Sequence, residues 1–396
     1  MKFETHFISE LIDEISMGPF GSNIKVECFV DDGVPVLNGS NLEGYELKED
    51  SFRYVTEEKA DSLNKANAYR GDVVITHRGT LGQIVFIPQT SKYERYVISQ
   101  SQFRIRCNDK ILPEYMVYYF HTRIGQHKLL SNASQVGVPA LARPSTTFQK
   151  IDIEIPDIDT QSQIVAILQT IHDKIVVNTT INENLEQQAY LLLEQILSTP
   201  HDDICTLSDI ANINPRYTLS KGTEARYIDM SQLSTTTSFP DGWTFRPYNG
   251  GMKFRNKDTI MARITPCLEN GKTAYIDFLE EDETAFGSTE YIVLSPKDNV
   301  PSELLYCIVR YPEFRTYATI NMNGSSGRQR VSGEIIGKYE IPSFTQEELS
   351  AFGAVAKPLF KQITENSLQN RNLSALRDTL LPKLMNGEID VSAVRI

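Results

Sequence analysis

Residues 161–198 place mainly apolar side chains at alternating three- and four-residue steps. This spacing forms a heptad seam, which predicts a long helix that packs against a partner helix. At about 1.5 Å per residue, the predicted helix is roughly 57 Å long. The seam positions are Ile164, Leu168, Ile171, Ile175, Asn178, Asn182, Leu185, Ala189, Leu192 and Ile196.

The same pattern recurs 188 residues further along the chain. Its positions are Phe352, Ala356, Leu359, Ile363, Asn366, Asn370, Leu373, Arg377, Leu380 and Leu384. The second stretch therefore supplies the partner helix within the same chain. The common offset favours this helix pair over the alternative, in which each amphipathic helix packs in a separate core.

Two asparagines occupy the same places in both seams, and asparagine at a seam position fixes register at a cost in stability. An antiparallel pair brings Asn178 to Asn370 and Asn182 to Asn366. A parallel pair would instead bring Asn178 to Asn366. We favour the antiparallel pair, because each helix follows its own globular segment and a pseudo-two-fold axis then relates the two halves.

The globular segments repeat as well, so the sequence predicts an α+β protein made of one duplicated unit. The predicted domains are residues 1–155 and 200–341 for the two globules, and 156–199 and 342–396 for the helical regions. In the first globule we expect a helix at 7–15, strands at 34–37, 72–76, 82–87 and 102–106, a helix at 113–130, a polar loop at 131–145 and a strand at 152–155. In the second we expect strands at 258–263 and 290–294, a helix at 302–317, a polar loop at 321–332 and a strand at 340–342.

The formal net charge of −12 argues against a simple nucleic-acid binder, but the charge is unevenly distributed. Residues 70–150 hold 11 Lys and Arg against 4 Asp and Glu, a net +7 that suggests a local anionic ligand. The five cysteines are scattered and the six histidines show no ligand spacing, so we expect a reducing cytoplasm and no metal site. We find no apolar run that predicts a membrane span.

Several motifs, in order along the chain, carry a resemblance to a known family. They are Gly18-Pro19-Phe20-Gly21-Ser22-Asn23-Ile24-Lys25, then Gly71-Asp72-Val73-Val74-Ile75-Thr76-His77-Arg78-Gly79-Thr80-Leu81-Gly82, then Ile98-Ser99-Gln100, the seam after Ile155-Pro156, and Leu380-Leu381-Pro382-Lys383-Leu384-Met385-Asn386-Gly387-Glu388-Ile389. With the doubled plan, the chain resembles the specificity (S) subunit of type I restriction-modification systems.

The resemblance implies a DNA-recognition subunit that catalyses nothing itself. Each globule would be a target recognition domain that reads one half of a bipartite double-stranded DNA sequence, and the helices would fix the spacer. Two methyltransferase subunits would dock on it and methylate adenine with S-adenosylmethionine, which binds to them and not to this chain. Restriction subunits would join through that complex.

Arginine and lysine contact phosphates, and arginine, glutamine and serine also read base edges. The strongest candidates lie in the small-residue loop of the second globule, and weaker ones lie in the equivalent loop, in turns after strands, and on one strand of the first globule. The proposed DNA-contacting residues are Lys25, Arg78, Arg104, Gln135, Arg143, Arg263, Ser326, Arg328, Gln329 and Arg330. The single tryptophan, Trp243, is better explained by packing than by base stacking.

The sequence also allows a test of two other functional classes, a methyltransferase and a protein-binding adaptor. Asn214-Pro215-Arg216-Tyr217 superficially resembles an amino-methyltransferase motif, but arginine replaces its second proline and we find no cofactor loop or P-loop, so we expect no catalytic residues. A coiled-coil adaptor with two protein-binding globules remains the alternative, which the acidic total favours slightly. Steep salt dependence of DNA binding would separate the two.

Overall fold

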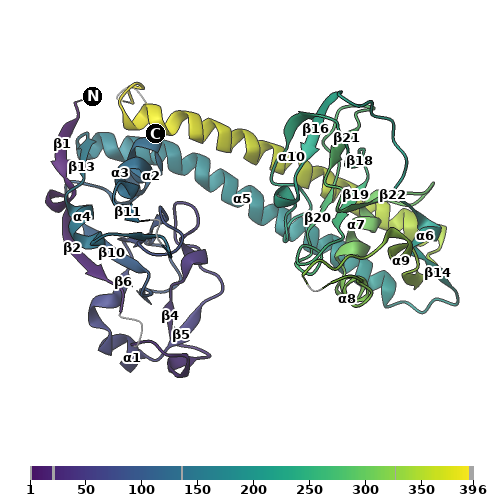
Figure 1. Ribbon diagram of the computed structural model, residues 1–396, viewed down its shortest axis with the longest axis horizontal. Helices are drawn as coiled ribbons and strands as arrows, with labels where there is room; N and C mark the ends of the chain where they lie inside the picture. Colours follow the sequence, from purple (N-terminus) through teal and green to yellow (C-terminus); the bar gives the residue numbers. More distant parts are fainter. Residues whose placement is uncertain (1, 20–22, 135–136, 326, 392–396) are drawn as a thin grey trace. The chain divides into compact units, whose positions relative to one another are not determined.

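The structure is a computed structural model, and it describes residues 2–19, 23–134, 137–325 and 327–391. The chain forms two compact units: residues 1–173 with 374–396 make unit 1, and residues 174–373 make unit 2 (Figure 1). Two 40-residue helices, α5 (Ile158–Leu197) and α10 (Gln346–Met385), contribute residues to both. Each unit therefore combines one globule with parts of both long helices.

The globule of unit 1 is built on two small sheets. One has the antiparallel order β2 (Ile12–Met17), β10 (Gln102–Cys107), β7 (Asp72–Thr76), β8 (Ile84–Phe86). The other has the order β3 (Phe29–Val30), β5 (Arg53–Val55), β4 (Val34–Val36), β9 (Arg95–Val97), β6 (Asn67–Tyr69), with β4 and β9 parallel. The remaining elements are the pairs β1 (Glu4–Phe7) with β13 (Asp152–Ile155) and β11 (Ala133–Ser134) with β12 (Ala140–Leu141), and helices α1 (Glu57–Ser62), α2 (Pro113–His121), α3 (Arg123–Leu130) and α4 (Pro144–Gln149).

Unit 2 repeats this plan almost strand for strand. Its sheets have the orders β15 (Ala211–Ile213), β22 (Tyr291–Pro296), β19 (Thr259–Ala262), β20 (Thr273–Tyr275), and β17 (Thr244–Pro247), β16 (Glu224–Ile228), β21 (Ala285–Gly287), β18 (Met252–Phe254). The remaining elements are the pair β14 (Ile204–Thr206) with β23 (Glu340–Pro342), and helices α6 (Leu207–Ile210), α7 (Ser302–Arg310), α8 (Pro312–Ile320) and α9 (Gly333–Gly337). Again one inner pair, β16 with β21, is parallel.

Each predicted strand is present, but three helix predictions, at 7–15, 113–130 and 302–317, need correction. The prediction of a helix at 7–15 is wrong, because these residues form the end of β1, a 3-10 turn at Ile8–Glu10 and the start of β2. The helix predicted at 113–130 is two helices, because Thr122 adopts an extended conformation and its Oγ1 accepts the Gly125 N–H at 3.0 Å. In unit 2 the corresponding break falls at Tyr311, before a proline, where the helical conformation is disfavoured.

The long helices run antiparallel, as predicted from the place of each helix after its own globule. In unit 2, Asn178 Nδ2 donates to Asn370 Oδ1 at 2.8 Å, and Asn366 Nδ2 donates to Asn182 Oδ1 at 2.8 Å. Asn178 is fully buried, so these bonds satisfy polar groups that would otherwise be costly to bury. The pairing fixes the register of α5 against α10.

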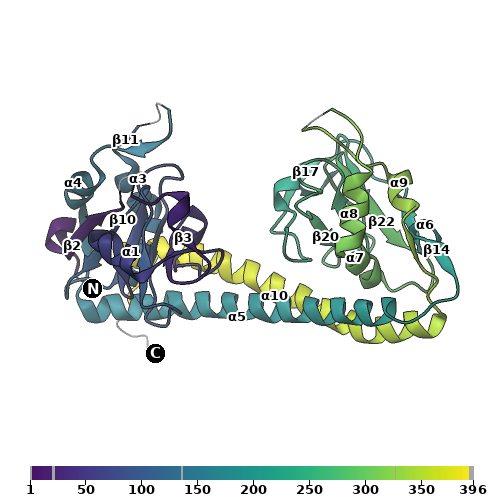
Figure 2. The ribbon, with the colours of Figure 1, turned by 90° about the horizontal axis from the view of Figure 1, so that it is seen from below.

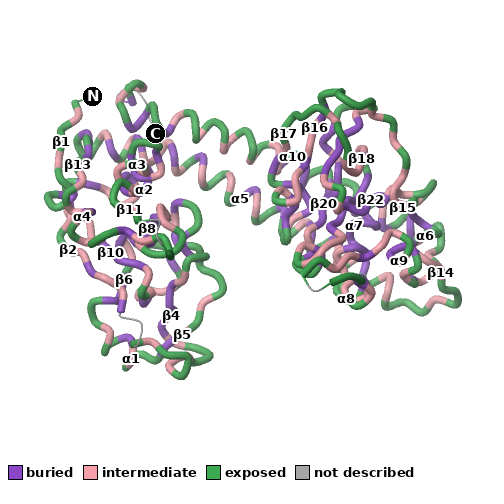
Figure 3. Tube along the Cα trace, viewed as in Figure 1, coloured by how far each residue is buried: buried purple, intermediate pink, exposed green. Residues whose placement is uncertain are grey.

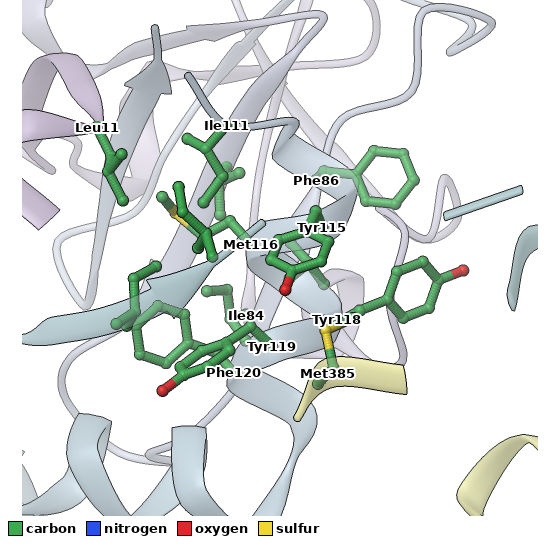
Figure 4. Close-up of a cluster of buried hydrophobic side chains, with 14 of the residues drawn as sticks. Leu11, Ile84, Phe86, Ile111, Tyr115, Met116, Tyr118, Tyr119, Phe120 and Met385 are labelled. Atoms are coloured by element: carbon green, nitrogen blue, oxygen red, sulfur yellow. The ribbon is translucent and has the colours of Figure 1, made fainter. Parts of the chain in front are cut away.

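Seam residues near the ends of the helices also belong to the cores of the globules. In unit 1, seam residues of α5 and α10 and residues beside the seam cluster with aromatic side chains of α2, and Figure 4 shows Met385 of α10 near Tyr118 and Tyr119. Those from the long helices are Ile164, Leu168, Leu381, Leu384 and Met385. The apolar stripe therefore attaches the globule to the helix pair, in addition to joining the helices.

Buried residues concentrate on the strands and the inner helix faces of each unit, and the loops between them are exposed (Figure 3). A second apolar cluster in each globule packs against the sheet that contains a parallel strand pair. Among the described residues, no helix combines the length and hydropathy needed to cross a membrane. The five cysteines are free.

Candidate nucleic-acid interface

The polar loop of unit 2, loop 2 (residues 321–332), is held at the end of β19 by main-chain hydrogen bonds. The Thr265 N–H donates to the Gln329 carbonyl at 3.1 Å. Asn323 and Arg330 exchange two main-chain bonds of 2.9 Å each, which close the base of the loop. In Figure 2 the segment between α8 and α9 lies on the side of the unit away from α5, so the loop projects from the globule and not toward the helix pair.

Loop 2 and the residue before β22 concentrate charge. The guanidinium of Arg330 holds Glu290 with Nε at 2.9 Å from Oε2 and Nη2 at 2.7 Å from Oε1. The hydrogen bond from Arg330 holds the pKa of Glu290 below its usual range. Arg328 is exposed, whereas Gln329 and Arg263 are half-buried. One exposed arginine therefore lies beside one arginine that is already paired.

The polar loop of unit 1, loop 1 (residues 131–145), is held in the same way. The Gly79 N–H donates to the Pro139 carbonyl at 2.9 Å, so the turn after β7 supports the β11–β12 hairpin. Arg78 and Arg143 are both exposed, and Arg143 takes a left-handed conformation with φ of 48° just before α4. Figure 2 shows this hairpin too on the side of its unit away from α5.

The main chain also fixes which residues of the two loops correspond. The Leu141 N–H donates to the His77 carbonyl at 2.9 Å, and the Val331 N–H donates to the Arg263 carbonyl at 3.0 Å. His77 is therefore the counterpart of Arg263. Arg78 therefore corresponds to the residue after Arg263, which is Ile264. Arg78 and Arg263 lie in equivalent turns of the two units, but at positions that differ by one residue.

Exposed arginines on closely held main-chain loops suit contacts with phosphates and base edges. No group of three or more His, Cys, Asp or Glu side chains that could hold a metal ion occurs within the described ranges. The exposed groups of these loops can recognise a ligand through hydrogen bonds and charge.

Comparison with known proteins matches residues 21–187 to the type I restriction modification DNA specificity domain. The chain is 22% identical over 410 residues to the type I restriction enzyme HindI specificity subunit of Haemophilus influenzae, with 81% of this chain and 87% of that protein covered. It is 22% identical over 415 residues to the MjaIX specificity subunit of Methanocaldococcus jannaschii, with 96% of this chain and 92% of that protein covered. Over most of its length the chain is similar to type I specificity subunits. The crystal structure of the S subunit from M. genitalium has the same fold, with a TM-score of 0.61 and 14% identity over 97% of this chain and 96% of that one.

One of the predicted DNA-contacting residues needs correction. Arg104 is only 3% exposed, and its Nη2 donates to Glu14 at 2.7 Å while Nη1 lies 3.3 Å from Asp72. The hydrogen bond from Arg104 lowers the pKa of Glu14. Arg106 also pairs with Asp72, at 2.9 Å. Arg104 therefore belongs to a buried ion cluster and not to a DNA-facing surface.

The remaining predicted residues have different surroundings. Lys25 is exposed and lies 3.5 Å from Glu27, in a segment apart from loop 1. Gln135 and Ser326 lie outside the described residues, as do residues 20–22 of the Gly-rich motif. The structure thus groups Arg78 with Arg143 in unit 1, and Arg263, Gln329 and the two loop 2 arginines in unit 2.

The basic block at residues 70–150 is partly neutralised within unit 1. Arg95 makes an ion pair with Asp61 of α1 at 2.5 Å and a second one with Glu57. Lys128 pairs with Asp152 at 3.0 Å. Folding brings acidic segments from elsewhere in the chain onto these cations. The net +7 therefore overstates the positive surface available to an anion.

The two motifs set aside in the sequence have structural partners. Trp243 stacks on Phe278 with ring centroids 4.5 Å apart, as the packing interpretation predicted. Asn214 Oδ1 accepts the Val293 N–H at 3.0 Å, and Tyr217 donates to Asp258 at 3.0 Å. The methyltransferase-like motif is thus a turn tied to β22.

Sequence reasoning missed Glu290, the residue that organises the charges of loop 2. Its only sequence signal is its place before β22, where a carboxylate precedes an apolar strand. It also missed Asp258, whose pKa burial raises to about 6. Both depend on which residues face one another across β19 and β22, which a single sequence does not specify.

Proposed function

We propose that this chain is a type I specificity subunit and that each globule reads one half of a bipartite DNA target, with loop 1 and loop 2 as the reading elements. The observation that carries the proposal is the repeated main-chain scaffold, in which a turn after β7 or β19 holds a polar loop. Different side chains stand on this common scaffold, so the two halves of the target would differ in sequence. The α5–α10 pair would set the spacer between them.

The specificity subunit is not itself an enzyme, since catalysis in this family lies in partner subunits. We propose that two methyltransferase subunits bind it, that they supply S-adenosylmethionine, and that restriction subunits join the same complex in the cytoplasm. Support comes from the similarity to specificity subunits of type I restriction enzymes. The exposed arginines of loop 1 and loop 2 add groups that can contact DNA.

Sequencing of modified adenines tests the proposal. The full chain would be co-expressed with type I methyltransferase subunits in a host that lacks adenine methylation, and genomic DNA would be sequenced. We expect one bipartite motif that is methylated on both strands and is absent without this chain. A complex that forms without methylation, or no complex at all, would contradict the proposal and favour the adaptor function.

A further inference from the structure

Loop 2 carries two arginines that the sequence treats alike but the structure does not. Arg330 grips the carboxylate of Glu290 with Nε and Nη2, at 2.7–3.0 Å. Its remaining nitrogen, Nη1, donates to the main-chain carbonyl of Arg328 at 3.2 Å. The guanidinium thus links a residue of the sheet to the main chain of the loop. Such a planar fork is a rigid connector, because its donors are fixed relative to one another.

Arg328 itself is the exposed arginine of the pair. Its side chain makes no hydrogen bond or ion pair with any residue that the structure describes, whereas its main chain is fixed by Arg330 and by its N–H, which donates to Ser325 at 3.0 Å. An arginine with a fixed main chain and a free guanidinium suits bidentate contact with the O6 and N7 atoms of guanine.

Gly324 lies close to the main-chain carbonyl of Arg328. Gly324 has a φ of 130°, and a Cβ at this position would approach the Arg328 carbonyl oxygen to 3.1 Å. Any side chain there would press on the carbonyl that Arg330 holds. Gly327, by contrast, has a φ of 76° but open space around it. Substitutions at the two glycines therefore separate crowding of the Arg328 carbonyl, which only a substitution at Gly324 would cause, from the main-chain strain that a side chain causes at either position.

Unit 1 has no counterpart of this connector. Arg330 bridges to Ile264, the residue after Arg263, and Ala140 bridges to Arg78, the residue after His77. Because His77 is the counterpart of Arg263, Ala140 is the counterpart of Arg330. In the same way, the N–H groups of Arg263 and His77 donate to the carbonyls of Glu290 and Ser101. Alanine and serine cannot form an ion pair. The ionic connector is thus particular to the second globule.

We propose that Glu290 is a positioning residue for DNA recognition: it fixes Arg330, and through it orients Arg328 as the base-reading arginine of the second globule. This inference rests on the proposed function. Arg330 then works as a connector, and not as a phosphate ligand. Glu290 also neutralises Arg330, so that loop 2 presents one net reading charge to DNA.

The two members of the pair should respond in opposite ways. In Glu290→Gln, Arg330 is released and becomes available to phosphate, so total DNA affinity is kept or rises while the base preference of one half-site is lost. The slope of log affinity against log salt should become steeper by about one ion. In Arg330→Gln, an unpaired carboxylate faces the DNA, so affinity falls about tenfold or more.

The test uses the full chain co-purified with its methyltransferase subunits and a duplex pool with randomised positions, followed by sequencing of the bound fraction. For Glu290→Gln and Arg328→Gln we expect degenerate bases in one half-site and an unchanged second half-site, which serves as the internal control. The charge-swapped variant Glu290→Arg with Arg330→Glu should recover part of the lost preference, which a general loss of folding would not allow.

Two results would overturn the inference. One is a Glu290→Gln variant whose half-site and salt slope equal those of the wild type. The other is an Arg328→Gln variant that keeps the full base preference of the wild type. If the wild type itself selects no motif, the proposed function fails, which is a separate and recognisable outcome. Gly324→Ala should reproduce the Arg328→Gln result, and Gly327→Asn, which tolerates the left-handed conformation, should not.

Discussion

Two aspartates in equivalent places show how much a residue depends on its neighbours. Asp72 and Asp258 each accept a main-chain N–H from three residues upstream, Tyr69 and Arg255, at 3.0 and 2.8 Å. Asp72 is also paired with the arginines of β10. Asp258 has hydroxyl partners instead, and desolvation raises its pKa to about 6.

We predict that the neutral replacement has opposite effects at the two sites. The pKa of Asp258 rises from 3.8 in the unfolded chain to about 6 in the folded one, so its contribution to stability is present below pH 4 and is lost as pH rises to 6. At two pKa units this is about 3 kcal/mol. Asp258→Asn should therefore gain stability relative to the wild type between pH 4.5 and pH 7.5.

Asp72→Asn is the matched comparison, and it should destabilise at pH 7.5 by about 1.5–3 kcal/mol, because the buried Arg104 keeps Glu14 but loses its second carboxylate partner. Thermal or urea unfolding of both variants at the two pH values measures the difference. The raised pKa of Asp258 would be contradicted if the difference in unfolding free energy between Asp258→Asn and the wild type were the same at pH 4.5 and pH 7.5.

At this scale the sequence predicted residue types better than roles. It singled out Arg104 and Arg330 because arginine contacts DNA, but Arg104 is buried among carboxylates and Arg330 is gripped by Glu290. These partners lie 32 to 90 residues away along the chain. Which charges meet is decided by strand register, and strand register is not visible in one sequence.

At the scale of elements, the helix pair was predicted most completely, because a heptad seam and its polar positions are local signals. Asn178 and Asn370 meet as expected. The false helix at 7–15 has the opposite cause: Ile8 and Leu11, both fully buried, have helical spacing, yet they pack under a sheet from either side of a 3-10 turn. Apolar spacing over so few residues does not distinguish the two.

We predict that Asn178 and Asn370 are energetically coupled. Asn178→Leu or Asn370→Leu alone leaves the partner amide short of a bond in a buried seam, and should cost about 1–3 kcal/mol. The double variant should cost less than the sum of the two, with a coupling of about 0.5–3 kcal/mol in a chemical-denaturation cycle. Asn184→Leu, on the exposed face of α5, is the control. Strict additivity would show that the asparagines act independently.

A second prediction concerns how α10 contacts the globule of unit 2. The Arg371 guanidinium carbon lies 3.8 Å from the ring centre of Trp243, the single tryptophan. Arg371→Met should cost about 0.5–2 kcal/mol and shift tryptophan emission. Arg377→Met makes the same change over Tyr45 in unit 1, where the distance is 5.0 Å, and should leave the emission unchanged.

At the scale of the whole molecule, net charge opposes DNA binding. With a formal charge of −12 and much of its basic block paired internally, the isolated chain should bind duplex DNA weakly, with a Kd above about 1 µM at physiological salt. Adding methyltransferase subunits should strengthen binding. Fluorescence anisotropy with and without them measures this. Tight, sequence-specific binding by the chain alone would contradict the prediction.

The division of the chain between the units has a consequence for its synthesis. Unit 2 is one continuous stretch, residues 174–373, and its own core can close once that stretch has left the ribosome. The core of unit 1 includes Leu381, Leu384, Met385 and Val391, which are translated after all of unit 2. The globule that is made first is therefore completed last. Until then, its exposed apolar face is the surface that chaperones would be expected to protect.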